Sequence, residues 1–350
     1  MAWIALMKAA WIERFGGHEV IRVNERVMPE RKPGELLIRM ATATLNHRDI
    51  YLRRGEAGRV GLPVVLGSDG AGEVAAADSS SLFTAGDRVA IYPVLACGQC
   101  RSCLANLPHK CRQFGMIGGE RNGTQAEYVV VPEACAVPMP DELDFDTAAA
   151  ISLAGLTAWN MVVDEGMAHP GEHALVLGGS GGVGAFTVLL LKHFGLTVHV
   201  VTSNLSKRDA LLALGADAVL DDNSASVLRH TRGLPEGGVD IAFNWVGGDT
   251  WRFLPPAVRT GGRILVCGTL RSPVAELDMR QIFYRNIALI GCSMGTPNAL
   301  QKFMQLAVKN PSLRVPLFEV ISLDEVPDAQ RRMEAGKVTG KIAVRIWQPS

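Results

Sequence analysis

The sequence predicts an α/β fold that combines a doubly wound parallel sheet of the Rossmann type with a lobe of short strands. Two observations carry this prediction. Short apolar runs alternate with helical stretches over residues 174–290, which is the pattern of a parallel sheet with helices on both faces. Short apolar runs separated by glycine turns fill residues 8–89, and this pattern is typical of a partly closed, barrel-like β-structure.

The composition excludes several functional classes. A chain of 350 residues suggests two domains, and a hydrophobic content of 48% is ample for two cores. The 35 basic and 35 acidic residues cancel, so we expect neither nucleic acid nor a membrane as a partner. Residues 1–7 are too short to span a membrane and lack the charged region and cleavage site of a signal peptide. We therefore expect a cytoplasmic protein that acts on a small molecule.

The first lobe is predicted to consist of strands joined by tight turns. Residues 20–23 and 35–40 are the first two predicted strands, and Pro33-Gly34 is the turn between them. Glycine-rich stretches at residues 62–74 and 85–89 extend the same pattern. These strands are too short to form a large open sheet, so we expect them to curl around one core.

Four of the seven cysteines form one cluster with the spacing C-x2-C-x2-C-x7-C. They are Cys97, Cys100, Cys103 and Cys111. Four thiolates on one loop complete a tetrahedral zinc shell and leave no open position, so we expect a structural zinc ion. An iron–sulfur cluster is the alternative for four cysteines, but the surrounding motifs are not those of electron-transfer proteins. An odd cysteine count with one tight cluster favours a metal site over a disulfide framework.

A glycine-rich turn at residues 178–184 connects a predicted strand, residues 174–177, to a predicted helix. Gly179, Gly181 and Gly184 fit the pattern G-x-G-x-x-G, in which the first glycine allows the tight turn. The second glycine lets the backbone approach a pyrophosphate, and the third lets the helix pack closely on the strand. We expect this turn and the helix N-terminus to bind a dinucleotide through Gly179, Ser180, Gly181, Gly182, Val183 and Gly184. The alternatives for this uncharged stretch are a turn without a ligand and a membrane span.

The end of the second predicted strand, residues 196–201, indicates which dinucleotide binds. An NAD site usually has an acidic residue there to bind the ribose 2′-hydroxyl, whereas this strand is followed by Thr202, Ser203 and Asn204. Lys207 and Arg208 come next, and a cation with nearby hydroxyl groups suits a 2′-phosphate. The pattern favours NADP(H), with Ser203 and Lys207 as ligands. NADH and a solvated helix start are the alternatives.

The alternation of strands and helices continues to the end of the chain. Predicted strands at residues 216–220, 239–243, 263–267 and 286–290 complete a six-stranded sheet. Beyond Gly295 we expect a helix over residues 298–308, a strand over 317–321, a helix over 323–335 and a strand over 341–347.

Taken together, these motifs resemble those of the medium-chain dehydrogenase/reductase superfamily over nearly the whole chain. The four-cysteine loop, Gly155-Leu156-Thr157-Ala158-Trp159, the glycine turn and Gly340-Lys341-Ile342 follow one another in the family's order. The resemblance implies a GroES-like catalytic domain from residues 1–154 and 295–350, with a Rossmann domain at 155–294 and the substrate between them. It also implies cofactor contacts from Thr157 and Lys341, and a homodimer or homotetramer assembled through the strand near residues 286–290.

The sequence departs from the zinc alcohol dehydrogenases of this superfamily at the catalytic metal. In that branch the metal is held by a cysteine, a Gly-His-Glu segment and a second cysteine. The matching positions here are Asn46, Gly67-Ser68-Asp69 and Leu153. An amide, a hydroxyl and an alkyl group do not replace two thiolates and an imidazole, so we expect one structural zinc and no catalytic zinc. A weak site for a hard cation at Asp49 and Asp69 is the alternative.

The segment Asn46-x-x-Asp49-x-Tyr51 resembles the quinone oxidoreductase and enone or enoyl-thioester reductase branch. This resemblance implies hydride transfer from NADPH to the β-carbon of an activated C=C bond, or to a quinone. Tyr51 is the candidate proton donor or enolate partner and Asn46 a candidate hydrogen-bond donor, while Asp49 is expected to hold the loop. Tyr51 could instead be a core aromatic residue, and either His47 or Arg48 could contact the cofactor.

Two other functions are compatible with the sequence. One is an alcohol or aldehyde dehydrogenase-type carbonyl reductase of the same superfamily that works without catalytic zinc. The other is a non-enzymatic binding protein similar to zeta-crystallin. The zero net charge disfavours an RNA-binding role for such a protein, although it leaves room for a local basic patch.

Overall fold

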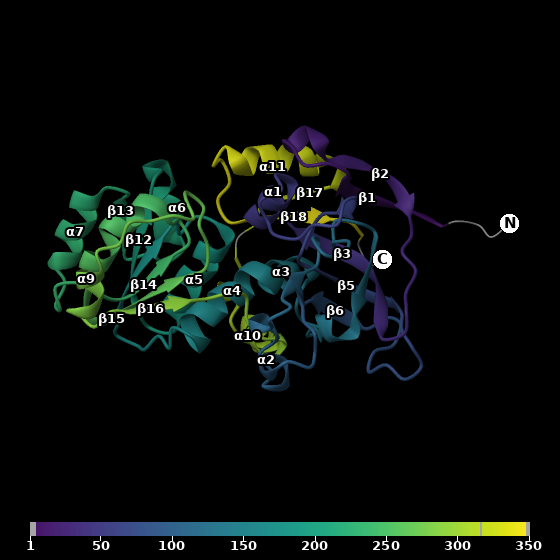
Figure 1. The fold of residues 1–350 in the computed structure, drawn as a ribbon, viewed down its shortest axis with the longest axis horizontal. Coiled ribbons are helices and arrows are strands. Elements are labelled where there is room, and N and C mark those ends of the chain that lie inside the picture. Colours follow the sequence, from purple (N-terminus) through teal and green to yellow (C-terminus); the bar gives the residue numbers. More distant parts are fainter. Residues whose placement is uncertain (1–4, 316, 348–350) are drawn as a thin grey trace. The chain divides into compact units, whose positions relative to one another are not determined.

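The computed structural model describes residues 5–315 and 317–347, and the chain divides into two compact units (Figure 1). Unit 1 combines Met1–Leu156 with Met294–Ser350, and unit 2 is Thr157–Ser293. These bounds lie within two residues of the expected domain boundaries. Within the described residues, no helix is both long enough and apolar enough to cross a membrane.

Unit 2 is a six-stranded parallel sheet with the order β13-β12-β11-β14-β15-β16. The strands are β11 (His173–Leu177), β12 (Thr197–Thr202), β13 (Ala218–Asp221), β14 (Val239–Asn244), β15 (Val258–Val266) and β16 (Ala288–Gly291). Counted from β11, this order is 3-2-1-4-5-6, which is that of a dinucleotide-binding sheet. The predicted doubly wound sheet is therefore confirmed.

The helices of unit 2 are short, and α5 is the longest of them. They are α5 (Gly182–His193), α6 (Arg208–Ala213), α7 (Ser224–Arg232), α8 (Leu254–Ala257) and α9 (Met279–Phe283), with shorter turns η5 (Asn160–Asp164), η6 (Leu205–Lys207) and η7 (Gly248–Arg252). The central strands are buried on both faces because helices cover them, which explains their continuous apolar runs. Leu175, Phe243 and Ile264 belong to this core and are fully buried.

Unit 1 contains a seven-stranded sheet with the order β10-β6-β5-β3-β18-β17, in which β9 also pairs with β3. The strands are β3 (Glu35–Thr44), β5 (Gly70–Ala76), β6 (Arg88–Ile91), β9 (Tyr128–Pro132), β10 (Ala136–Pro138), β17 (Leu317–Ile321) and β18 (Lys341–Arg345). A second sheet has the order β2-β1-β4, from β1 (Leu6–Ile12), β2 (Arg22–Val27) and β4 (Val64–Val65), and β7 (Val94–Leu95) pairs with β8 (Gly115–Met116). This arrangement fits the expected GroES-like domain.

The helices and turns of unit 1 lie between these strands and after unit 2. They are η1 (His18–Val20), α1 (His47–Arg53), α2 (Arg101–Leu104), η2 (Pro108–Lys110), η3 (Glu133–Cys135), α3 (Phe145–Ala150), η4 (Ile151–Gly155), α10 (Pro297–Lys309), η8 (Pro311–Leu313), η9 (Leu323–Glu325) and α11 (Val326–Glu334). The short helix α4 (Leu156–Trp159) begins at the last residue of this segment of unit 1 and continues into unit 2. The strand predicted at residues 20–23 was wrong in part, because a helical turn occupies His18–Val20 and β2 begins only at Arg22.

The C-terminal strand β18 determines the position of the site in unit 1. It pairs antiparallel with β3, with Ala343 opposite Thr44 and Val344 opposite Ala43. This register brings Lys341, at the start of β18, next to Leu45, where β3 ends and the chain turns into α1. Residues nearly three hundred positions apart in sequence therefore become neighbours.

Candidate functional site

The glycine turn of unit 2 has the geometry of a phosphate-binding loop. Gly178, directly after β11, has φ +76°, so the tight turn that we assigned to Gly179 is made at Gly178 instead. Gly179 is needed for packing, since a Cβ there would lie 2.7 Å from Val200 Cγ1. A Cβ on Gly184 would lie 2.4 Å from the carbonyl oxygen of Gly178, so this glycine lets α5 pack closely. A Cβ on Gly181 would meet no atom within 4 Å, which leaves room for a ligand.

The N-terminus of α5 offers unpaired donors to an anion. Gly181 is its N-cap residue and has no side chain to bond the first backbone N–H groups. Ser180, Gly182 and Val183 are partly exposed, whereas Gly179 and Gly184 are buried. The twelve-residue helix carries a positive dipole end at this point. These residues fit the pyrophosphate of a dinucleotide.

A hydroxyl group, that of Ser203, and an ammonium group, that of Lys207, follow shortly after the end of β12 along the chain. Ser203 is exposed, and the Asn204 side chain accepts hydrogen bonds from the backbone N–H and the hydroxyl of Ser206, which holds the turn η6. Lys207 ends η6 and is half-buried, and burial lowers the pKa of its ammonium group. The Arg208 guanidinium donates to the Val219 carbonyl at 2.8 Å, so it is already used inside unit 2.

The four clustered cysteines of unit 1 are arranged as a zinc site. Four of their sulfur–sulfur distances lie between 3.5 and 4.0 Å. A tetrahedral ion with Zn–S bonds of about 2.3 Å requires about 3.8 Å between sulfurs, so the thiols fit this geometry. Backbone N–H groups donate to the Cys97 and Cys100 sulfurs and lower the pKa of both thiols, that of Cys100 to about 6. Burial raises the pKa of Cys103, so the spacing of the four sulfurs, and not their pKa values, is what suits a metal ion here.

Among the described residues, this cysteine cluster is the only group of three or more metal-ligating side chains with ligand atoms close together. Leu153 lies in η4, and Ser68 and Asp69 lie just before β5. The Ser68 hydroxyl accepts a hydrogen bond from Arg48 Nη1 at 3.2 Å. An alkyl group, a hydroxyl and an amide are poor zinc ligands, so we still expect no catalytic zinc at Asn46, Ser68 and Leu153. The absence of a catalytic ion stays a prediction.

Asp69 is the centre of a buried polar network in unit 1. Its carboxylate accepts hydrogen bonds from the Thr44 hydroxyl at 2.6 Å and from Asn46 Nδ2 at 2.8 Å. The Lys341 ammonium, 2% exposed, lies 3.4 Å from the same oxygen and donates to Asn46 Oδ1 at 2.7 Å. It also donates to the Leu45 carbonyl at 3.0 Å. Asp69 is fully occupied by these neighbours, which argues against a weak metal site there.

The Asn46 side chain is held at both ends of its amide. It forms a reciprocal cap at the start of α1, in which the Asn46 backbone N–H donates to Asp49 Oδ2 at 2.9 Å. Because Lys341 and Asp69 bind the two ends of the amide, Asn46 is positioned rigidly. Its role as a hydrogen-bond donor to substrate stays a prediction, as does a cofactor contact from Lys341. Thr157 lies in α4 and is buried.

Asp49 is buried without enough hydrogen bonds for a carboxylate. Its Oδ1 atom and the Oε1 atom of Gln125 have no hydrogen-bond partner, although Gln125 Nε2 lies 3.5 Å from Asp49 Oδ2. Burial raises the pKa of Asp49 to about 7. A buried carboxyl oxygen without a donor suits the protonated form of Asp49, in which one oxygen carries its own hydrogen.

Tyr51 lies in α1, one turn beyond Asn46. Its side chain is half-buried, and its hydroxyl group has no hydrogen-bond partner in the described part of the chain. Burial raises the pKa of the phenol above its ordinary value, so the group keeps its proton at neutral pH. The geometry leaves the hydroxyl able to donate to a ligand.

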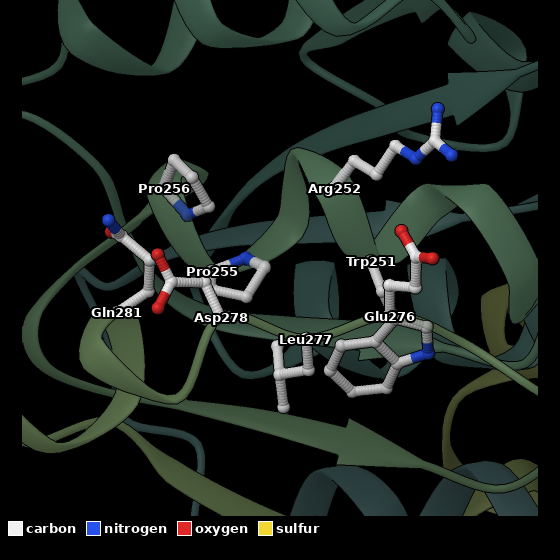
Figure 2. Close-up of a pocket in the computed structure, with 8 residues that line it drawn as sticks. All are labelled: Trp251, Arg252, Pro255, Pro256, Glu276, Leu277, Asp278 and Gln281. Atoms are coloured by element: carbon white, nitrogen blue, oxygen red, sulfur yellow. The ribbon is translucent and has the colours of Figure 1, made fainter.

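A separate hollow of about 380 Å³ lies on unit 2, between α8 and the chain leading into α9 (Figure 2). Trp251, Pro255 and Leu277 supply its apolar surface, and Arg252 and Glu276 are charged residues of its lining. No residue of the glycine turn lines it, so it is distinct from the dinucleotide site. Sequence reasoning gave no indication of this hollow.

Comparison with known proteins places these sites in a family. The model described as "Alcohol dehydrogenase GroES-like domain" matches residues 32–141, and "Zinc-binding dehydrogenase" matches residues 182–309. A solved NAD-dependent alcohol dehydrogenase is 33% identical, with a TM-score of 0.89, over 97% of this chain and 100% of that one. The chain belongs to the medium-chain dehydrogenase/reductase family. The predicted family and its two-domain architecture are thus confirmed.

Other proteins similar to this medium-chain dehydrogenase/reductase carry different names. An alcohol dehydrogenase of Geobacillus stearothermophilus is 28% identical over 346 residues, which are 97% of this chain and 100% of the relative. A crotonyl-CoA carboxylase/reductase is 23% identical, with a TM-score of 0.89 over 97% of this chain and 88% of its own, and shows a shared fold. Family membership supports an oxidoreductase that uses a nicotinamide cofactor, and leaves the reaction to be argued from the site.

Sequence reasoning missed two features of this site. One is the buried contact between Asp49 of α1 and Gln125, in which one oxygen of each side chain lacks a hydrogen bond and which no motif indicates. The other is the position of the Arg48 guanidinium between Ser68 and Met116. An arginine between Asn46 and Asp49 was the available signal, but its direction depends on Ser68 and on Met116 of β8, which are 20 and 68 positions away.

Proposed function

We propose that this protein is an NADPH-dependent reductase that transfers a hydride to a C=C bond conjugated to a carbonyl group, or to a quinone. The observation that carries the proposal is the polar network at Asn46 and Asp69. Where zinc-dependent relatives would hold a catalytic metal, the side chains bind one another and include a neutral amide and a hydroxyl. A substrate that carries its own electron-withdrawing carbonyl group can accept a hydride without a Lewis acid on the enzyme.

The choice of NADPH over NADH is supported by the residues after β12. No acidic side chain occupies residues 202–204, and the half-buried Lys207 follows within one turn. A relative is named NAD-dependent, so the family name does not decide the cofactor. A half-buried ammonium beside an exposed hydroxyl suits the additional phosphate of NADPH.

Within this proposal each part of the chain has a defined task. When bound, NADPH supplies the hydride. The glycine turn and the start of α5 hold its pyrophosphate, and Lys207 holds its 2′-phosphate. Tyr51, whose phenol stays protonated, donates the proton that completes the reduction. The cysteine loop holds a structural zinc ion and takes no part in the chemistry.

The test is NADPH oxidation by the purified protein with quinones, an enone, an enal, an acryloyl thioester and a simple aldehyde. We expect turnover with conjugated acceptors or quinones and little with the aldehyde. Tyr51→Phe should lower turnover more than it weakens NADPH binding, while Tyr128→Phe, on β9 in the same unit, serves as a control. Turnover with the simple aldehyde alone would favour the carbonyl reductase that the names of the relatives suggest.

A further inference from the structure

Arg48 is a half-buried cation that forms no ion pair with the described part of the chain. Its guanidinium is half-buried, and burial lowers the pKa of this group. Asp49 and Glu120 are the carboxylates that attract it, but neither forms an ion pair with it in the described chain. Asp49 accepts from Asn46 and Glu120 accepts from the Met116 backbone N–H at 2.8 Å, so both are used elsewhere. A half-buried charge without a counter-ion is costly unless a ligand supplies one.

The guanidinium is nevertheless fixed in position by two neutral groups. Nη1 donates to the Ser68 hydroxyl at 3.2 Å, and Nε donates to the Met116 sulfur at 3.0 Å. Ser68 is completely buried and Met116 nearly so, which means that both partners are themselves held firmly. These contacts orient the planar group but leave its charge unbalanced.

The remaining nitrogen, Nη2, faces the bare backbone of Gly119. A Cβ at this position would lie 2.9 Å from Nη2, so any side chain there would force the guanidinium to move. In the described chain Nη2 donates to no protein group, although the other two nitrogens do. Two N–H bonds of a fixed cation therefore remain for an oxygen atom that does not belong to this chain.

We propose that Arg48 binds the carbonyl oxygen of the acceptor through Nη2 and stabilises the negative charge that reduction places on this oxygen. The inference rests on the proposed function and specifies its substrate class, namely acceptors whose C=C bond is conjugated to a carbonyl oxygen. Arg48 thus supplies the electrophile of this site. The Ser68 hydroxyl and the Met116 sulfur act as positioning groups for it.

The step places a negative charge on an oxygen atom, where such a group can stabilise it. Hydride addition to the β-carbon moves the electron pair of the C=C bond to the α-carbon, and the carbonyl oxygen takes the negative charge of the enolate. A proton then adds to the α-carbon and the C=O double bond is restored. Arg48 donates hydrogen bonds to the oxygen throughout and neither gains nor loses a proton.

The inference is tested with Arg48→Met, Arg48→Lys and the control Arg59→Met, which removes an exposed arginine of the same unit. Arg48→Met should lower kcat for an enone by roughly 10²- to 10³-fold, as the loss of an oxyanion donor does. Arg48→Lys should restore part of this loss, since the charge remains without the planar fork. The affinity for NADPH should be the same in all variants, and thermal unfolding shows whether each is folded.

A second measurement tests the anion site without turnover. 4-Nitrophenolate is a flat mimic of an enolate whose absorbance responds to hydrogen bonds at its oxygen. We expect the protein loaded with NADP⁺ to bind it, and Arg48→Met to weaken this binding by about 10- to 100-fold. Gly119→Ala, which displaces Nη2, should weaken it as well, whereas Arg59→Met should not.

The outcomes separate this inference from the proposed function. Phenolate binding that depends on Arg48, in a protein that reduces no conjugated acceptor, would support the anion site and contradict the proposed reaction. If Arg48→Met leaves kcat for an enone unchanged, the inference about Arg48 is overturned and the proposed reaction is not affected. Weakened NADPH binding with unchanged phenolate binding would assign Arg48 to the cofactor phosphates, which also overturns it.

Discussion

At the scale of single residues, cofactor choice depends on Lys207. We expect Lys207→Ala to weaken NADPH binding by roughly 10- to 100-fold, because a charged hydrogen bond contributes about 1.5–3 kcal/mol, and to leave NADH binding nearly unchanged. Fluorescence titration with both cofactors measures this. Arg208→Ala is the matched control, since its guanidinium already donates to Val219. Equal losses for NADPH and NADH in Lys207→Ala would refute the assignment.

The raised pKa of Asp49 predicts that the protein becomes less stable as pH rises. Burial raises its pKa to about 7 in the folded protein, above the ordinary value of 3.8. Between these two values the folded state binds more protons than the unfolded state, so this carboxyl group lowers the free energy of unfolding as pH rises. Asp49→Asn keeps an oxygen acceptor for Asn46 and does not titrate.

Denaturant unfolding of wild type and Asp49→Asn between about pH 4 and pH 8 measures this effect. The wild type should lose stability relative to the variant by up to about 1.4 kcal/mol per pH unit within this window. Parallel stability curves for the two proteins would mean that Asp49 is an ordinary carboxylate.

At the scale of elements, the turn between β11 and α5 contains glycines with different roles. Gly184 is needed for packing, and Gly181 is expected to be needed for cofactor binding. A Cβ at Gly184 would lie 2.4 Å from the Gly178 carbonyl oxygen, so Gly184→Ala should destabilise unit 2 by about 1–3 kcal/mol. A Cβ at Gly181 meets open space, so Gly181→Ala should leave stability unchanged and weaken cofactor binding. Thermal unfolding and NADPH titration of both variants distinguish the two roles, and equal behaviour of the variants would contradict them.

The elements also show what local sequence can predict. The strands of unit 2 were predicted within a few residues because each is a buried apolar run bounded by turn residues, as at β11 and β14. The strand expected at residues 20–23 was misplaced because one helical turn at His18–Val20 depends on contacts beyond the local pattern. The grouping of the four cysteines was predicted residue by residue, since their spacing on one loop is enough to bring the thiols together.

The rest of the candidate site could not be predicted because long-range contacts build it. Lys341 reaches Asn46 only through the pairing of β18 with β3, and Arg48 is oriented by Met116 of β8. Gln125 Nε2 likewise reaches Asp49 Oδ2 from a distant part of the chain, and one oxygen of each side chain stays without a hydrogen bond. Sequence patterns show which residues are chemically able to act, and the fold decides which of them meet.

At the scale of the whole molecule, the exposed strand β16 indicates that copies of this chain associate. It is the edge strand of the sheet in unit 2 and is largely exposed, with Leu289 41% exposed. Large exposed apolar side chains precede it in sequence, including Met279, Phe283 and Tyr284. An unpaired apolar edge is a surface for another strand, so we propose a homodimer or homotetramer that buries it.

Light scattering after size exclusion measures this assembly. We expect at least a dimer for wild type and a smaller species for Leu289→Lys. Leu82→Lys, at a position 91% exposed on unit 1, should leave the assembly unchanged. A monomeric wild-type protein would contradict the proposal.

The account as a whole depends on reduction without a catalytic metal, and metal analysis combined with turnover on the same sample tests it most directly. We predict about one zinc ion per chain, lost in a Cys100→Ser variant, and full enone turnover with no metal beyond that ion. A second tightly bound zinc ion per chain, retained in Cys100→Ser and removed together with activity by a chelator, would contradict the account.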